Sequence, residues 1–311
     1  MPPSYEKINY QLRTGKNVER KMLVDAFRRL VEFGALRTYR YVGFGSTYFS
    51  DFNLFHKTLG INRMTSIEKD IENNRRFLFN RPFVCVRLAF GHSNEVLPTI
   101  NWKSKVILWL DYDTRLGAPV LADINHFCTN ALPGSVLLLT VDARVDRLDD
   151  RLRLLRERVG EMKVPPDITA PSLALWGTAG AYHRIMNNEI LERLHDRNGS
   201  LDPDRKLNYR QLFNFHYADG AQMLTVGGII YEQRQQATFD RCAFRKHLDF
   251  IREGAEPYLI ETPNLTFREL HYLDSKLPTR ATIRDAFIPQ ADVDRYARLY
   301  RYFPRFAEAE F

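Results

Sequence analysis

The chain has 311 residues, 44% of them hydrophobic and 27% charged, which is the composition of an ordinary globular protein with a substantial core. It contains no apolar run long enough to span a membrane, no secretory signal, and three widely spaced cysteines that suit neither a disulfide framework nor a metal site, so we expect a cytoplasmic protein without a membrane partner. The net charge of +7 fits an anionic partner such as nucleic acid, but it is also common in plain enzymes, which is the favoured interpretation.

Helices and short apolar strands alternate along the first half of the chain. Residues 17–33 carry apolar side chains at helical spacing and end at Gly34, a helix stop. Five strands are predicted next, at 37–45, 64–70, 83–91, 105–113 and 134–143. Helices are predicted between and after them, at 48–60, 71–81, 93–100, 118–132 and 144–161. Such a series predicts a parallel sheet with helices on both faces.

The second half of the chain no longer shows this alternation of helices and strands. We expect mixed helix and loop at 161–218, two strands broken at Gly227-Gly228 within 222–242, and mostly helix from 243 onward. The prediction is a single α/β domain over 1–311, Rossmann-like and doubly wound, with helical additions at the N-terminus and elsewhere. Its core covers about 17–160 and 221–242, and the other two additions are an insertion at about 161–218 and a C-terminal extension at about 243–311.

Polar and glycine residues stand where the predicted strands end. Ligands of doubly wound sheets bind at the carboxyl ends of the strands, so these residues are the first candidates for a site. Glu68 ends the second strand, 23 residues after Gly45, a distance at which a carboxylate can accept hydrogen bonds from ribose hydroxyls. The other strand ends are Gly43-Phe44-Gly45-Ser46, Gly91-His92-Ser93, Asp111-Tyr112-Asp113 and Asp142. Together they favour a ligand that contains a nucleoside.

Several nucleotide and catalytic motifs are missing. The third glycine of a dinucleotide motif is replaced by Tyr48, which argues against NAD and FAD and hence against an oxidoreductase. There is neither a phosphate loop for ATP or GTP nor the glycine-flanked serine of a hydrolase. A nucleoside without a pyrophosphate fits better.

The order of these motifs resembles the class I S-adenosylmethionine-dependent methyltransferases, most closely the O-methyltransferase branch that includes catechol-type enzymes. The segments that carry the resemblance are YVGFGS, SIEKD, GHSNEVLP, VILWLDYD and GSVLLLTVDA. The resemblance covers roughly 38–145 and, more loosely, 221–240, where QMLTVGGIIYEQ is similar to the antiparallel strand pair that ends the sheet of this superfamily. It implies a mostly parallel sheet of seven strands.

The resemblance also implies roles for individual residues. Gly43, Phe44, Gly45 and Ser46 would line the methionine part of S-adenosylmethionine, Glu68 with its neighbour Lys69 would bind the ribose, and His92 and Ser93 would flank the adenine. Asp111 would lie beneath the sulfonium and the substrate, and Asp111 and Asp113 are the expected catalytic residues. The family usually has an acidic residue just before its first glycines, where this chain has Arg40 and Tyr41.

Metal use stays open at this point. In metal-dependent members, an Asp after the fourth strand and an Asp-Asn pair after the fifth hold magnesium. This chain has Asp111, Asp113 and Asp142, but Ala143 replaces the asparagine. Magnesium is therefore an option, and no metal ligand is assigned.

Three further groups have both a functional and a structural interpretation. Lys16 is a candidate base, although a solvated face is the favoured interpretation. Trp176, Tyr182 and His183 could form a substrate lid or a packed loop, and Arg210, His216 and Tyr217 could contact nucleic acid or form an aromatic helix packed on the sheet.

Two classes of function remain. The first is a methyltransferase acting on oxygen or nitrogen of an unidentified acceptor, either a small molecule or a nucleic acid. The second is a nucleic-acid-binding or partner-binding protein that keeps the fold with weak or lost catalysis. A homodimer is compatible with both.

Overall fold

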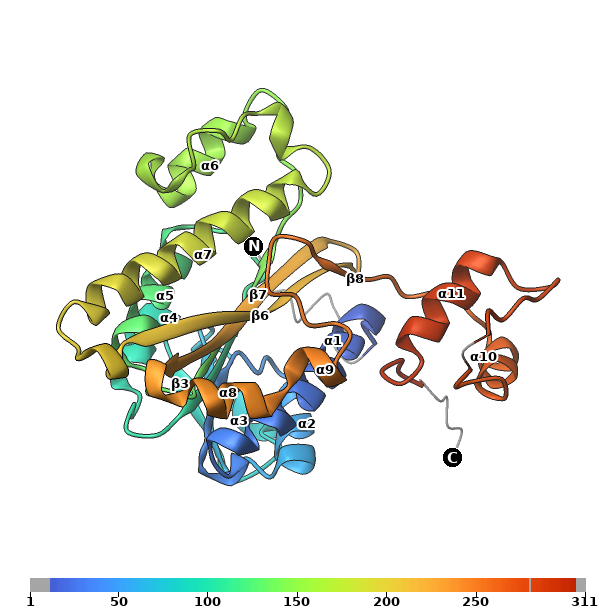
Figure 1. Cartoon of the computed structure of the whole chain (residues 1–311), viewed down its shortest axis with the longest axis horizontal. Helices are drawn as coiled ribbons and strands as arrows, with labels where there is room; N and C mark the ends of the chain where they lie inside the picture. Colours follow the sequence, from blue (N-terminus) through green and yellow to red (C-terminus); the bar gives the residue numbers. More distant parts are fainter. Residues whose placement is uncertain (1–11, 280, 306–311) are drawn as a thin grey trace.

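A computed structural model of the chain describes residues 12–279 and 281–305. Its centre is a sheet of eight strands in the order β3-β2-β1-β4-β5-β7-β6-β8, with helices packed on both faces (Figure 1). In the described residues the strands are β1 (Arg40–Gly43), β2 (Arg63–Glu68), β3 (Val86–Phe90), β4 (Val106–Asp111), β5 (Val136–Asp142), β6 (Leu207–Ala218), β7 (Gln222–Glu232) and β8 (Tyr258–Ile260).

The helices precede, separate and follow these strands. The α-helices of the described residues are α1 (Thr14–Arg28), α2 (Ser50–Leu59), α3 (Asn74–Asn80), α4 (Ser93–Val96), α5 (Ala118–Asn130), α6 (Arg151–Val159), α7 (Gly177–Asn198), α8 (Gln236–Cys242), α9 (Phe244–His247), α10 (Phe267–Asp274) and α11 (Gln290–Leu299). Short 3-10 helices are η2 (Arg29–Phe33), η3 (Leu36–Thr38), η4 (Leu97–Thr99), η5 (Glu161–Lys163), η6 (Pro171–Leu173), η7 (Pro203–Arg205) and η8 (Gln233–Gln235).

The strand directions place the carboxyl ends of β1 to β5 along one edge. These five strands are parallel, β7 runs antiparallel to both β5 and β6, and β8 pairs parallel with β6. The strand order turns back between β1 and β4, because β2 and β3 lie on one side of β1 while β4 and β5 lie on the other. Such a switch point opens a crevice outside the strand ends, where ligands bind. The predicted α/β class with a mostly parallel sheet is confirmed.

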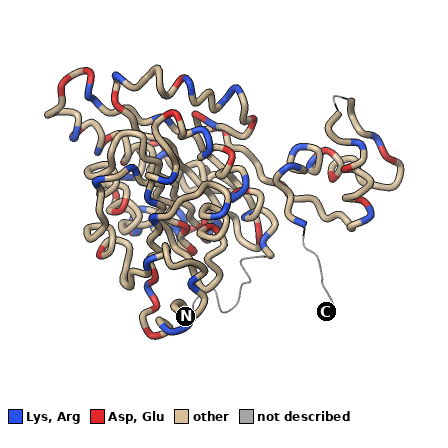
Figure 2. The backbone as a smooth tube through the Cα atoms, turned by 90° about the horizontal axis from the view of Figure 1, so that it is seen from below, with Lys and Arg blue, Asp and Glu red and all other residues tan. Residues whose placement is uncertain are grey.

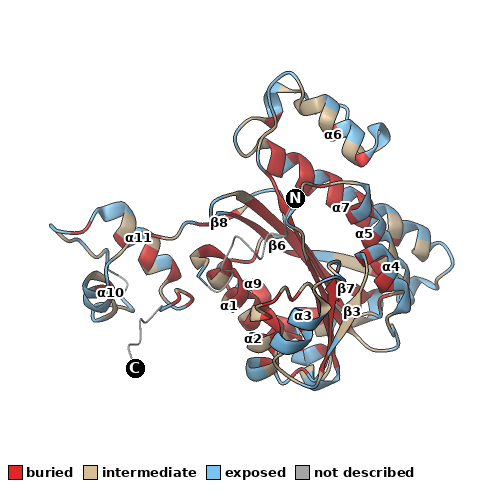
Figure 3. Cartoon of the chain, turned by 180° about the vertical axis from the view of Figure 1, so that it is seen from behind, coloured by how far each residue is buried: buried red, intermediate tan, exposed pale blue. Residues whose placement is uncertain are grey.

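Each face of the sheet has its own core. On one face α1 and α2 pack against the sheet through side chains such as Phe27 and Phe55. On the other, α5 and α7 do so through side chains such as Phe127 and Ile185. β5 serves both faces, since Leu138 belongs to the first cluster while Leu137 and Leu139 belong to the second. This alternation explains why its sequence is apolar throughout, and Figure 3 shows the buried layers on the two sides.

Residues 207–218, expected as helix and loop at the end of the insertion, form the long strand β6 instead. The strand is buried along most of its length on both faces, and polar residues interrupt its apolar pattern. Gln211 and Asn214 are buried and hydrogen-bonded to backbone carbonyls of Gly254 and its neighbours, so tertiary contacts satisfy groups that the sequence makes look loop-like.

The expected break at Gly227-Gly228 is also wrong, because β7 runs through both glycines without interruption. A Cβ added to Gly227 would lie 2.2 Å from the carbonyl oxygen of Leu137 in β5, and one added to Gly228 would lie 2.2 Å from that of Arg210 in β6. The glycines therefore permit close approach of both neighbouring strands. The turn of the hairpin falls at residues 219–221, with Gly220 in the left-handed region at φ 85°.

The C-terminal extension holds an eighth strand in addition to its helices, so the expected count of seven is one too low. β8 has only three residues, too few for a visible pattern in the sequence. Beyond it, α10 and α11 share a small core of their own and lie to one side of the sheet (Figure 1). Tyr302 joins this part to α1 by donating a hydrogen bond from its hydroxyl to Asp25 (3.1 Å).

Candidate active site

A cavity of about 480 Å³ opens at the carboxyl ends of β1, β2, β3 and β4, at the switch point of the sheet. Its volume lies within the range of about 300–1,000 Å³ that is usual for small-molecule sites. The residues that line it are Arg20, Phe44, Gly45, Ser46, Ser50, Asp51, Ile67, Glu68, Lys69, Asp70, Phe77, Gly91, His92, Ser93, Asn94, Glu95, Trp109, Asp111, Tyr112, Asp113, Thr114 and Pro119.

The loop after β1 is shaped by close packing beneath it. A Cβ on Gly45 would lie 2.5 Å from Ser66 Oγ and 2.6 Å from the ring of Phe49, so only glycine fits here. Ser46 (φ 49°) and Phe49 (φ 46°) both have left-handed backbone, which side chains of this kind rarely adopt. Such backbone conformations cost free energy and cluster at ligand sites, which marks this loop as a functional candidate.

Glu68 connects that loop to the end of β2. The backbone N–H of Gly45 (3.1 Å) and the hydroxyl of Ser66 (2.6 Å) both donate to Glu68 Oε1. Burial raises the pKa of Glu68 to about 7, although these two donors and the N–H of Ser46 act in the opposite direction. A carboxylate has about four lone-pair positions, so Glu68 can still accept hydrogen bonds from a ligand.

Asp51, at the start of α2, adds a second buried carboxylate to the wall. Tyr41 donates its hydroxyl to Asp51 Oδ2 from the middle of β1. Burial raises the pKa of Asp51, and the nearby positive charge of Arg20 lowers it. Tyr41 thus holds a carboxylate from a helix in the wall of the cavity.

Asp111 and Asp113 follow β4 and differ in their surroundings. Asp111 is a quarter exposed and forms an ion pair with the buried Lys16 (2.9 Å from Nζ to Oδ1). Asp113 is 40% exposed and pairs loosely with Lys69 (3.7 Å). Asp113 is therefore the carboxylate more open to a molecule entering from solvent.

The far wall comes from β3, α4 and the aromatic residues opposite. His92 is the N-cap of α4, and its N–H donates to Glu95 (3.1 Å). Ser93 begins α4, and Tyr112 donates its hydroxyl to Asp123 Oδ2 of α5. Burial and the charge of Asp123 raise the pKa of Tyr112 well above its usual value, so this phenol keeps its proton.

Most of the residues singled out from the sequence meet in this cavity. Phe44, Gly45, Ser46, Glu68, Lys69, His92, Ser93, Asp111 and Asp113 all line it. Gly43 lies beneath the loop, where a Cβ would meet the hydroxyl of Tyr41 at 2.6 Å, and is not among the lining residues. Asp142 is not among them either, and pairs with Arg144 (2.6 Å). The roles of these residues in binding a ligand stay a prediction.

Several lining residues have no counterpart in the prediction. Arg20 and Asp51 come from helices, whereas the sequence pattern points to the ends of strands. Arg20 is one helical turn beyond Lys16, so the pair of basic residues four positions apart in α1 is the signal that could have pointed to it. For Asp51 the sequence offers only its place early in a helix, which is a common position for any acidic residue.

The remaining sequence candidates lie elsewhere. Lys16 is 1% exposed, so the solvated face expected for it is wrong. Trp176 stacks on His216 of β6 with ring centroids 4.7 Å apart, and His183 hydrogen-bonds to Gln211 (2.8 Å). His216 is also part of a strand and not of the aromatic helix considered for it. The cavity is lined by none of these four candidates, Lys16, Trp176, His183 and His216.

In residues 12–279 and 281–305, no group of three or more His, Cys, Asp or Glu side chains is arranged to hold a metal ion. Over the same residues, no helix combines the length and the apolar character that a membrane span requires.

Residues 8–311 match the model of a family described as "Putative O-methyltransferase". The chain belongs to this family. The match confirms the predicted superfamily of S-adenosylmethionine-dependent methyltransferases and its O-methyltransferase branch. No curated protein matches the chain.

Some solved structures also show similarity to the chain. The O-methyltransferase TomG from Streptomyces achromogenes, in complex with S-adenosylmethionine, shares 14% identity over 68% of this chain and 79% of that one, with a TM-score of 0.35. Trm1 from Pyrococcus horikoshii, with S-adenosylmethionine, shares 10% identity over 83% of this chain and 67% of that one, with a TM-score of 0.45. An O-methyltransferase from Bacillus cereus with S-adenosylhomocysteine shares 13% identity over 66% and 80%, with a TM-score of 0.34.

Proposed function

We propose that the cavity at the ends of β1 to β4 binds S-adenosylmethionine and that the chain transfers its methyl group to an oxygen, or a nitrogen, of an acceptor. The observation that supports this best is the buried carboxylate of Glu68 at the end of β2, held by the glycine loop through the Gly45 N–H. A carboxylate in that position suits the two hydroxyls of a ribose.

The charge of the cavity fits this cofactor. Six carboxylates line it, against the two permanent cations Arg20 and Lys69: Asp51, Glu68, Asp70, Glu95, Asp111 and Asp113. A cleft of one charge sign attracts ligands of the other. S-adenosylmethionine is a net cation, because it carries a sulfonium and an ammonium beside one carboxylate. ATP and NAD are net anions and would be repelled.

Individual residues of the chain then have separate tasks. Glu68 accepts hydrogen bonds from the ribose, and the loop at Gly45 and Ser46 lets the backbone come close to the ligand. Asp51 faces the cavity as an acceptor suited to an ammonium group, oriented by the hydroxyl of Tyr41. Phe44 and Tyr112 pack edge to face, with ring centroids 5.2 Å apart, and add an apolar surface.

S-adenosylmethionine supplies an electrophilic methyl group on its sulfonium. The main contribution of the protein is to hold the acceptor in line with that group, since positioning lowers the barrier most in such displacements. Asp113 is the candidate to take the proton from the acceptor, because it lines the cavity and is 40% exposed. Asp111, a quarter exposed at the end of β4, supplies fixed negative charge next to it.

Thermal unfolding in the presence of different ligands tests this proposal. We expect S-adenosylmethionine to raise the melting temperature, since a ligand that binds only the folded chain stabilises it, and ATP and NAD to leave it unchanged. Stabilisation by ATP or NAD in place of S-adenosylmethionine would refute the proposal.

A second cavity supports an additional anion-binding function. It measures about 420 Å³ and is bordered by four arginines, Arg28, Arg29, Arg241 and Arg301, against the acidic residues Asp25 and Glu32. Elsewhere in the described chain, basic and acidic positions are intermixed (Figure 2). Binding of an RNA oligonucleotide that weakens with salt and with Arg301→Ala would support this function. Binding that ignores both would exclude it.

A further inference from the structure

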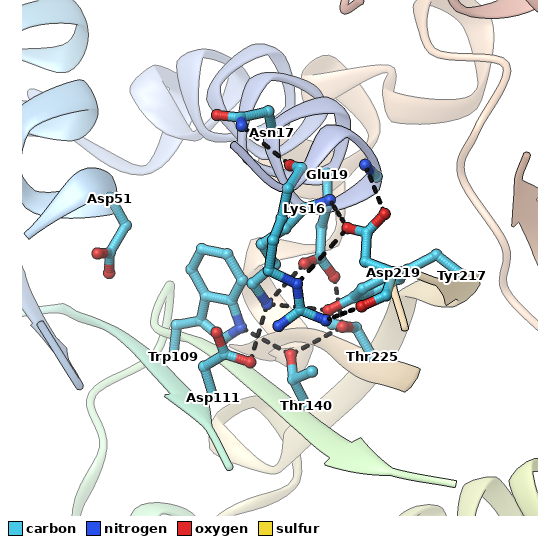
Figure 4. Close-up of polar contacts among 12 residues, drawn as sticks. Lys16, Asn17, Glu19, Asp51, Trp109, Asp111, Thr140, Tyr217, Asp219 and Thr225 are labelled. Carbon is cyan, nitrogen blue, oxygen red and sulfur yellow. Dashed lines mark hydrogen bonds and ion pairs between the residues drawn. The ribbon is translucent and has the colours of Figure 1, made fainter. Parts of the chain in front are cut away.

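Lys16 of α1 is buried directly behind the cavity. Its ammonium group contacts Asp111 Oδ1 (2.9 Å), Glu19 Oε2 (2.8 Å) and the hydroxyl of Tyr217 (3.2 Å). It also lies 4.3 Å from the ring centroid of Trp109, a cation–π contact. Figure 4 shows the lysine reaching from the helix into this group. Two ion pairs, one hydrogen bond and the indole ring therefore surround the ammonium group.

The partner Glu19 is itself held by a chain of hydroxyls. The indole N–H of Trp109 donates to Thr140 Oγ1 (3.0 Å), Thr140 Oγ1 lies 2.7 Å from Thr225 Oγ1, and Thr225 donates to Glu19 Oε1. Either hydroxyl of the Thr140–Thr225 pair can donate to the other, and Thr225 is the donor to Glu19. Burial raises the pKa of Glu19, whereas the ammonium group of Lys16 and the hydroxyl of Thr225 lower it.

The first turn of α1 is held by hydrogen bonds close to the Lys16 side chain. Asp219, just after β6, accepts hydrogen bonds from the backbone N–H groups of Gly15 (3.1 Å) and Lys16 (2.8 Å). These contacts fix where the helix begins relative to the sheet. Unlike the bonds of Lys16, they do not reach a residue that lines the cavity.

We propose that Lys16 is a positioning residue, which holds the carboxylate of Asp111 in one orientation at the floor of the cavity. This inference rests on the proposed function and extends it to a residue of α1 behind the cavity. Lys16 pairs with two carboxylates, Asp111 and Glu19. It also does not line the cavity. Its effect on a bound ligand therefore passes through Asp111.

The double variant Lys16→Met/Glu19→Gln separates positioning from charge, because it removes one positive and one negative charge together. The long-range field in the cavity stays nearly constant, whereas Asp111 loses its ammonium partner. We expect the dissociation constant for S-adenosylmethionine, measured by calorimetry, to rise about tenfold, which corresponds to about 1.4 kcal/mol.

The same substitutions in an Asp111→Asn background complete the test. If Lys16 acts through Asp111, they cause no further loss of affinity there. An equal loss in both backgrounds, or no loss in either, would overturn the inference while wild-type binding upholds the proposed function. A wild-type chain that does not bind S-adenosylmethionine overturns both.

Two other variants distinguish an effect on Asp111 from a general effect on folding. Asp219→Asn loosens the start of α1 without touching Asp111, so we expect a lower melting temperature with an unchanged dissociation constant. If the double variant does not fold, Tyr217→Phe takes its place, since it removes the hydroxyl group that accepts a hydrogen bond from Lys16. We then expect a rise in the dissociation constant of about threefold, absent in the Asp111→Asn background. Its persistence there would contradict the role of Lys16.

Discussion

Glu68 shows how one side chain can connect the protonation state of the site with ligand binding. Its pKa is raised to about 7 by burial, while donors from the glycine loop and Ser66 limit the shift. A carboxylate that accepts hydrogen bonds from both ribose hydroxyls must first lose its proton. Proton loss and ligand binding are therefore coupled.

We predict that the affinity for S-adenosylmethionine rises with pH. Between about pH 6 and about pH 8 the dissociation constant should fall, by at most about tenfold per pH unit below the pKa. Calorimetry at several pH values measures this, and Glu68→Gln, which cannot titrate, should give a flatter curve. The same slope in both proteins would show that another group controls the pH dependence.

The stability of the free protein should follow the opposite trend. A raised pKa means that folded Glu68 binds its proton more tightly than the unfolded chain does. Its contribution to the free energy of unfolding is therefore present at low pH and lost as pH rises through about 7. Ligand-free wild type should lose stability relative to Glu68→Gln between pH 4.5, the ordinary pKa of a glutamate, and about pH 7. Denaturant titrations at several pH values measure this loss.

Strand β7 illustrates, at the level of elements, how a local signal can mislead. A glycine pair predicts a turn, but here the strands on either side approach too closely for any side chain. The information lies in the neighbouring strands β5 and β6 and not in the residues next to the glycines.

We predict that Gly227→Ala lowers the free energy of unfolding by about 3 kcal/mol or more, because the added Cβ meets a backbone carbonyl that cannot move aside. Gly180→Ala is the matched control, since that glycine lies in α7 with no atom within 4 Å of an added Cβ. It should stabilise the chain by about 0.5–1 kcal/mol. Equal stability of the two variants would contradict the close packing around β7.

The parallel half of the sheet could be predicted from the sequence, whereas in the other half only the strand character of 222–232 could be. β1 to β5 are apolar runs separated by helices, so their pattern is local. β6 carries buried Gln211 and Asn214, whose partners lie some forty residues away, and β8 is only three residues long. In the cavity, strand-end residues such as Glu68 were found, whereas Arg20 and Asp51 needed the packing of α1 and α2.

For the molecule as a whole, we propose one methyltransferase-like domain with additions at both ends of the chain. α1 is an integral part of this unit, since Lys16 and Arg20 connect it to the cavity. The part with α10 and α11 has a separate small core and joins the body through contacts such as Tyr302 with Asp25. An acidic cavity within a chain of net charge +7 leaves the positive charge to other surfaces.

The most direct measurement is calorimetric titration of S-adenosylmethionine into the wild-type chain and into Glu68→Ala. We predict a micromolar dissociation constant for the wild type and a loss of at least about tenfold in the variant, which removes an acceptor of two hydrogen bonds. No binding to the wild type, or equal binding to both proteins, would contradict a cofactor site at the ends of β1 to β4.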